Sequence, residues 1–229
     1  MNDAFAIPED RFVIEQPVDV RLGFIRKVYS LFLLTIGTSA AMTYAVMSIP
    51  VVADLAGQYW FAWLLLYLGL SWGSNLIARQ GAAVGYGLLA VLSVVTGLFF
   101  GPTIKFYAVT QGMEVVYQAF GLTSAIFGGL TAYVFVTRKD FSFLAGALWM
   151  GLFALIGVGI LGLFINFSFE FRHAITFAGV LLFIGFILYD TSNILHHYRE
   201  DQFAVATVAI YLDFVILFMK LLRILGRRR

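Results

Sequence analysis

Long uncharged runs, rich in Leu, Phe, Val and Gly, alternate with short polar breaks along most of the chain. A helix needs about 20 mainly apolar residues to cross the hydrocarbon core of a bilayer, and these runs are near or above that length. The six uncharged runs are Val28–Ala53, Leu55–Ala78, Gln80–Ile104, Val115–Thr137, Phe141–Phe169 and His173–Tyr189. This pattern predicts an all-α membrane protein.

A seventh apolar segment, Phe203–Leu225, contains three charged residues, Asp213, Lys220 and Arg223. The last two side chains are long enough to reach the headgroup region, so the segment still qualifies as a span. We therefore predict a single bundle of seven transmembrane helices, with the N-terminus inside and the C-terminus outside. A six-span alternative has both termini inside and Phe203–Leu225 in the interface or re-entering the membrane. It satisfies the positive-inside rule better and stays open.

The polar segments divide the chain into a tail and one domain. Residues 1–23 mix acidic and basic side chains, lack a signal-peptide pattern and are predicted to form a solvated N-terminal tail. Residues 24–229 then form one transmembrane domain, because the connections leave no room for a domain outside the membrane. Small residues that recur every four positions are typical of membrane helices that pack closely. Two such rows are Gly81/Gly85 and Gly121/Ala125/Gly129.

Composition narrows the classes of function. Hydrophobic residues make up 61% of the chain and charged residues 12%, with a mean hydropathy of +0.91, which leaves too little charge to cover a water-soluble particle. The lack of cysteine excludes disulfides, thiolate nucleophiles and cysteine-ligated metals. The net charge of +2 reflects the C-terminal arginines rather than a basic face, so nucleic acid is not an expected partner.

Two acidic residues, Asp190 and Asp213, lie deep within apolar segments. An acid near the middle of a membrane helix costs on the order of 2.5–3.5 kcal/mol, so packing or protonation must offset the cost. The two positions lie at similar distances on either side of Asp201, which brings them level in adjacent antiparallel helices. Two carboxyl groups so close in a low dielectric do not readily ionise together, and the pair is predicted to share a proton. A purely structural interpretation, with each acid satisfied within its own helix, stays open.

Other polar residues are weaker candidates. Arg79 is expected to lie at the same end of the bundle as the last connection, where it competes for the acids or simply anchors the topology. Glu114 opens a span at the opposite end, where it caps a helix or attracts cations. His196 and His197 are neighbours in a polar connection. A solvated loop is favoured there over a metal site, because successive residues do not share a helix face.

Several segments match one known family when taken together. They are Ala119-Phe120-Gly121 through Thr137-Arg138-Lys139-Asp140-Phe141-Ser142-Phe143-Leu144, Ile187-Leu188-Tyr189-Asp190-Thr191, and Leu212-Asp213-Phe214 through Leu221-Leu222-Arg223-Ile224-Leu225-Gly226. In these segments the chain resembles prokaryotic members of the Bax inhibitor (transmembrane Bax-inhibitor-motif) family. The resemblance implies seven helices with the last one central and, in bacterial members, a pH-sensitive calcium leak in the inner (cell) membrane.

The resemblance also bears on the polar candidates. Asp190 and Asp213 match the paired aspartates of the family, and Arg79 falls where some members have a partner arginine. Gln80 and Gly81 depart from the basic run that can follow that arginine. Some relatives lack one or both aspartates and are linked instead to membrane proteases.

The leading functional hypothesis is a passive, proton-gated calcium pathway in which Asp190, Asp213 and Arg79 form the pH sensor and gate. Calcium prefers about 6–8 oxygen ligands, so two carboxylates supply only a weak metal site that is compatible with flow. We expect no resident cofactor and no catalytic residue. The expected partners are the lipid bilayer, Ca²⁺ and protons.

Two rival hypotheses stay open. One is a membrane interaction protein that regulates a membrane protease or another partner without ion transport. The other is an intramembrane aspartyl protease, because paired aspartates on adjacent helices can activate water. The Gly-Xaa-Gly-Asp pattern associated with such proteases is absent at Asp190 and Asp213, so the chain is not expected to be an enzyme.

Overall fold

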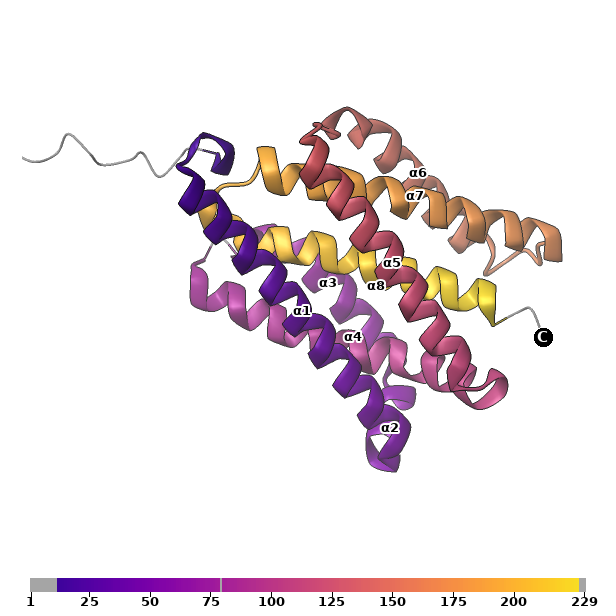
Figure 1. The fold of residues 1–229 in the computed structure, drawn as a ribbon. Helices are drawn as coiled ribbons and strands as arrows, with labels where there is room; N and C mark the ends of the chain where they lie inside the picture. The colour runs from indigo at the N-terminus through magenta and orange to yellow at the C-terminus, as the bar shows by residue number, and fades with distance from the viewer. Residues whose placement is uncertain (1–11, 79, 227–229) are drawn as a thin grey trace, which may run out of the picture.

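The computed structural model describes residues 12–78 and 80–226, and this part of the chain is almost entirely helical (Figure 1). Its α-helices are α1 (Val18–Ser48), α2 (Pro50–Gln58), α3 (Trp60–Ala78), α4 (Ala82–Gln111), α5 (Met113–Thr137), α6 (Ala145–Leu161), α7 (Phe169–His196) and α8 (Phe203–Leu225). Short 3₁₀ turns form η1 (Val13–Glu15), η2 (Ser142–Leu144) and η3 (Glu200–Gln202). No strand occurs in the described ranges, so the all-α prediction is confirmed.

Within these ranges, seven helices are long and apolar enough to cross a membrane, and only α2 is too short. The prediction of a seven-helix bundle is therefore confirmed. The six-span alternative is not supported, because α8 is a regular helix in the interior of the bundle rather than a segment lying at its surface (Figure 1).

The last helix occupies the centre, where α1, α3, α4, α5 and α7 pack around α8 (Figure 1). Among the spanning helices α8 has the largest buried share, and Ile210, Tyr211, Leu217 and Leu222 are fully enclosed. Apolar side chains lie on all sides of α8, which is the pattern of a helix surrounded by other helices. The central position that the family resemblance implied is confirmed.

Helix boundaries differ from the uncharged runs, because charged residues near an interface do not end a helix. α1 begins at Val18, well before Val28, and ends at Ser48 because Pro50 starts the separate helix α2. α4 continues through Lys105, and α7 begins at Phe169 with charged residues in its first turn.

The beginning of the described chain differs from the solvated tail expected for residues 1–23. Val13 is 1% exposed, and its N–H donates a hydrogen bond of 2.9 Å to the carbonyl oxygen of Tyr198. The apolar side chain of Val13 is buried where η1 packs against α1 and α7. Of the predicted tail, residues 1–11 lie outside the described residues, and Asp19 and Arg21 belong to α1.

The small-residue rows have opposite outcomes. A Cβ atom added at Gly85 would lie 2.9 Å from Ala204 Cβ, so the absence of a side chain lets α4 approach α8 closely. At Gly121 and Gly129 nothing lies within 4 Å of an added Cβ. The prediction that this row packs closely against another helix is therefore wrong. The approach of α4 to α1 is closer still at Gly97, where an added Cβ would lie 2.6 Å from Met42 Cβ.

Candidate functional site

Asp190 and Asp213 meet between α7 and α8, which run antiparallel along each other. Their carboxyl groups lie within hydrogen-bond reach of one another. Asp213 is only 3% exposed and Asp190 is half-buried. Oδ2 of Asp213 has no hydrogen-bond partner among the described residues. The two acids are thus level, as their spacing indicated, while their role in gating stays a prediction.

Polar groups that the sequence analysis missed surround this pair. The side chain of Asn193, one turn further along α7, hydrogen bonds to the carboxyl group of Asp190. Tyr67 of α3 and Tyr198 of the α7–α8 connection lie within electrostatic reach of Asp213. Burial raises the pKa of Tyr198, and the nearby charge of Asp190 raises it further, so this phenol stays neutral and can donate a hydrogen bond.

Thr191, next to Asp190, belongs to a second buried polar cluster. It lies near Tyr29 of α1, which in turn is close to Thr131 of α5. The three buried hydroxyl oxygens have no partner of good hydrogen-bond geometry in the described part of the chain. Buried hydroxyls normally have partners, so this spot is an unusually polar interior beside the acids. The sequence feature that could have revealed this polar cluster is the run of four polar residues Asp190-Thr191-Ser192-Asn193 near the end of an apolar helix.

Tyr211 lies two residues before Asp213 and therefore on nearly the opposite face of α8. Its hydroxyl oxygen is 2.6 Å from Oγ of Ser39 on α1, and Thr96 of α4 adjoins it. Ser39 and Thr96 also line a cavity of about 370 Å³ between α1, α4, α5 and α8. Most other lining residues are apolar, among them Phe214.

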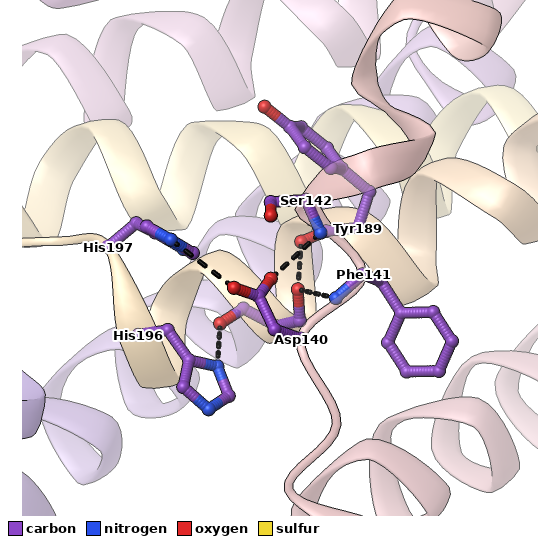
Figure 2. A network of polar contacts seen from close by, with 7 residues as sticks. Asp140, Phe141, Ser142, Tyr189, His196 and His197 are labelled. Carbon is purple, nitrogen blue, oxygen red and sulfur yellow. Dashed lines mark hydrogen bonds and ion pairs between the residues drawn. The ribbon is translucent and has the colours of Figure 1, made fainter.

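The connection between α5 and α6 is fastened to the end of α7, near Asp190 (Figure 2). The N–H of Phe141 donates a hydrogen bond of 3.0 Å to Oγ of Ser192. Oγ of Ser192 in turn donates to the carbonyl oxygen of Tyr189 at 3.1 Å. The carbonyl oxygen of Ser192 lies 2.9 Å from Nδ1 of His196. The bond from Phe141 thus ties the α5–α6 connection to the helix that carries Asp190, and the other two lie within α7.

Asp140 adds an ionic contact to the same connection (Figure 2). Its Oδ2 atom lies 3.4 Å from Nε2 of His197, and its Oδ1 atom accepts a 2.8 Å hydrogen bond from the N–H of Ser142. Slight burial opposes ionisation of Asp140, but hydrogen bonds from Ser142 and the charges of His197 and His196 together lower its pKa. His197 is largely solvated as expected, yet it also has a specific partner that sequence analysis missed.

The remaining candidates are less informative. Arg79 lies outside the described residues, so the structure does not place its side chain. The contact of Gly85 with Ala204 brings the start of α4 to the start of α8, so the α3–α4 and α7–α8 connections share one end of the bundle.

Glu114 lies in the first turn of α5, a position typical of a capping acid. Among the described residues, no cluster of three His, Cys, Asp or Glu side chains could hold a metal ion.

Comparison with known proteins now identifies the family. The model of the family described as inhibitor of apoptosis-promoting Bax1 matches residues 21–229. The chain is 30% identical to Bax inhibitor 1 of Schizosaccharomyces pombe, with 93% of this chain and 80% of the yeast protein covered. It is 32% identical to protein lifeguard 4 of Mus musculus, with coverage of 93% and 88%.

A bacterial relative extends the same comparison. The chain is 34% identical to an uncharacterized protein of Pseudomonas aeruginosa, with 89% of each chain covered. The family match and these full-length relatives agree with the fold and with the seven apolar helices. This multi-pass membrane protein therefore belongs to the Bax inhibitor family.

Proposed function

We propose that the protein is a pH-sensitive calcium leak channel in which the Asp190–Asp213 pair acts as the proton-responsive gate. The observation that carries this proposal is the contact between the two carboxyl groups, with Asp213 enclosed in the centre of the bundle. Two acids in one low-dielectric site favour a single shared proton, so the charge of the pair changes with pH. A change of charge at the α7–α8 contact alters how these helices pack.

The chemistry of the pair suits a hard cation. Calcium takes about 6–8 oxygen ligands, and affinity rises with the number and rigidity of charged ligands. The pair offers carboxylate oxygens from Asp190 and Asp213, while no third acidic or histidine ligand joins them within the described ranges. Backbone carbonyls and water would complete the shell. Such a site binds weakly, which is what conduction requires.

The cavity beside Tyr211 supports a closed conformation. It extends from Ile36 and Ser39 of α1 toward the end of the bundle opposite the α7–α8 connection. Neither Asp190 nor Asp213 lines the cavity, and Asp213 is buried next to Phe214, which does line it. An apolar passage of this kind resists wetting until it widens. Opening therefore requires α8 to shift relative to α1 or α7.

The groups that face the pair define its response to pH. Within the described residues they are Asn193 on α7, Tyr67 on α3, and Tyr198 in the α7–α8 connection. Asn193 has no titratable proton in the working range, and Tyr198 stays neutral because burial raises its pKa. Protonation of the pair itself is therefore the event that physiological pH controls.

Helical spans and bacterial relatives favour the inner membrane of a bacterium as the location.

Calcium flux into liposomes that contain the purified protein tests this proposal. Asp190→Asn and Asp213→Asn should each abolish the dependence of the leak on pH, because either change removes the shared proton. The double variant should behave like the single variants, since residues that act as a unit are not additive. Glu200→Gln is the matched control, because Glu200 is an exposed acid at the same end of the bundle. A pH-dependent leak that persists in both single variants would disprove the gate.

The alternative function is regulation of a membrane protease or another membrane partner without transport. The feature that favours it is α6, which lies at the side of the bundle, packs mainly on α7 and has Leu148 as its buried residue (Figure 1). Met150 and Phe153 are prominent on its surface. If a partner co-purifies equally with the wild type and the doubly neutralised variant, and neither leaks calcium, this alternative replaces the channel.

A further inference from the structure

A second cavity, of about 460 Å³, lies at the end of the bundle opposite the α7–α8 connection. The end of α6, the start of α7, the end of α8 and the connection between α6 and α7 form its walls. Its charged lining consists of Arg172 from α7 and of Lys220 and Arg223 from α8. The site therefore lies at the other end of α7 and α8 from the paired aspartates, and binding there is independent of calcium transport.

The charge of this cavity is uncompensated. No acidic residue lines it, and no ion pair of Arg172, Lys220 or Arg223 occurs within the described residues. Arg172 and Arg223 are exposed, while Lys220 is half-buried. Three cations that converge on one cavity repel one another unless an anion enters. Helix ends at this position lie near the membrane surface, where such an anion is available from lipid headgroups.

Lys220 is held in the cavity by the surface of α7. A Cβ atom added at Gly179 would lie 2.9 Å from Cε and 3.0 Å from Nζ of Lys220. The missing side chain at Gly179 thus leaves room for the end of the Lys220 side chain against α7, and Lys220 lines the cavity together with Thr176 and Arg172.

The rim of the cavity is apolar and uncovered. Leu163 and Phe164, in the α6–α7 connection, are 80% and 82% exposed. Leu163 also lines the cavity, as does Phe167, whose ring packs against Phe171 at 4.8 Å between centroids. A ligand that fits this arrangement has an anionic group for the cations and hydrocarbon for the rim.

We propose that this cavity binds a phosphate anion, and that the phosphodiester of an anionic phospholipid is its source. Arginine presents a planar pair of donors that matches two phosphate oxygens, and Lys220 contributes a third cationic donor from the other side of the cavity. Asn166 and Thr176 add uncharged polar groups to the lining. The acyl chains would lie along Leu163 and the outer surface of α6.

Native mass spectrometry of the full-length protein in detergent tests the site, with phosphatidylglycerol, phosphatidylcholine and inorganic phosphate added separately. We expect one phosphatidylglycerol to be retained in preference to phosphatidylcholine. Lys220→Gln and Arg172→Gln should each weaken retention about fivefold, and the double variant more strongly. Lys105→Gln is the matched control, because Lys105 lies at the same end on α4 but does not line the cavity. It should retain the lipid as the wild type does.

Further variants and ligands separate the outcomes. Lys220→Arg keeps the charge and should restore retention, while Gly179→Ala leaves every charge in place but displaces Lys220 and should weaken retention. If inorganic phosphate binds and displaces phosphatidylglycerol at equal concentration, the anion site stands and free phosphate is its source. Equal retention of phosphatidylglycerol by the wild type, Lys220→Gln and Arg172→Gln would overturn the proposal.

Discussion

The two ends of the α7–α8 pair carry charge in opposite ways. Near the α7–α8 connection, Asp190 and Asp213 are turned toward each other, and Asp213 is enclosed at the core of the bundle. At the other end, Arg172, Lys220 and Arg223 surround a cavity that is open at the membrane edge. One pair of helices therefore holds two acids in contact and three bases apart.

The difference follows from the size and hydration of the side chains. A short aspartate cannot reach the membrane surface from within a helix, so we propose that the two compensate each other by sharing a proton. Long basic side chains keep their charge by extending to the headgroup region. The acidic end is thus suited to respond to protons, and the basic end to hold an anion without changing its own charge.

The largest expected difference between the two ends is in the stability of two glycine-to-alanine variants. An added Cβ lies 2.9 Å from its neighbour at Gly85 and at Gly179, but the neighbour is Ala204 Cβ in the first case and the flexible Lys220 side chain in the second. Gly85→Ala must push α4 away from α8, whereas Gly179→Ala only displaces the lysine. Both variants replace glycine by alanine within a helix, so both gain the same helix propensity. The free energy of unfolding of Gly85→Ala should therefore be lower than that of Gly179→Ala by about 1–3 kcal/mol.

Reversible unfolding of the two glycine variants in the same detergent measures this difference. Gly121→Ala serves as a control, because nothing lies within 4 Å of an added Cβ at that position. Equal stabilities for Gly85→Ala and Gly179→Ala would show that the acidic end is no more tightly packed than the basic end.

A smaller difference between the two ends is expected in their response to salt. Raising the ionic strength from about 0.1 M to about 1 M shortens the screening length from about 10 Å to about 3 Å. Retention of phosphatidylglycerol should fall several-fold, because the basic cavity is accessible to ions, while the pH response of the calcium leak should be unchanged because Asp213 is enclosed. Lipid retention and flux measured across the same salt series provide the comparison, and a salt-sensitive pH response would contradict the enclosed gate.

The smallest expected effect concerns Asp140, which lies near the acidic pair but at the surface. Its pKa is lowered from the ordinary value of 3.8, so its stabilising contacts are fully present above pH 3.8 and are lost as the pH falls through the lowered value. Asp140→Asn should therefore reduce stability at neutral pH by less than about 1 kcal/mol, since the contact with His197 is exposed. The difference in melting temperature from the wild type should disappear in acid. If the difference in melting temperature stays constant across pH, the charge of the Asp140 carboxylate does not contribute to stability.

The sequence determined the helical architecture well, because long apolar runs have few alternatives in a membrane. It also located Asp190 and Asp213 at one level, since two positions equidistant from a short connection lie at the same height in an antiparallel pair. The boundaries were less accurate. Lys105, Glu170 and Arg172 lie within helices, which shows that charge marks the depth of a residue better than the end of a helix.

Contacts between distant segments could not be read from the chain. The polar neighbours of the acids come from α3 and from the α7–α8 connection, and the partner of His197 is Asp140 from the α5–α6 connection. The spacing of small residues identified Gly85 but also selected Gly121, because a four-residue interval does not reveal which helix, if any, lies opposite. Such pairings depend on the rotation of each helix about its axis, which apolar composition on all sides leaves undetermined.

The anchoring of Val13 to Tyr198 has a practical consequence for handling the protein. Tyr198 belongs to the shell of groups around the aspartates, so the segment just before α1 reaches the neighbourhood of Asp190 and Asp213 through a backbone hydrogen bond. Affinity tags or fluorescent labels joined close to Phe12 would disturb that bond. Labels intended for transport or binding measurements are therefore better attached upstream through a spacer, so that the residues from Phe12 to Val18 keep their native packing.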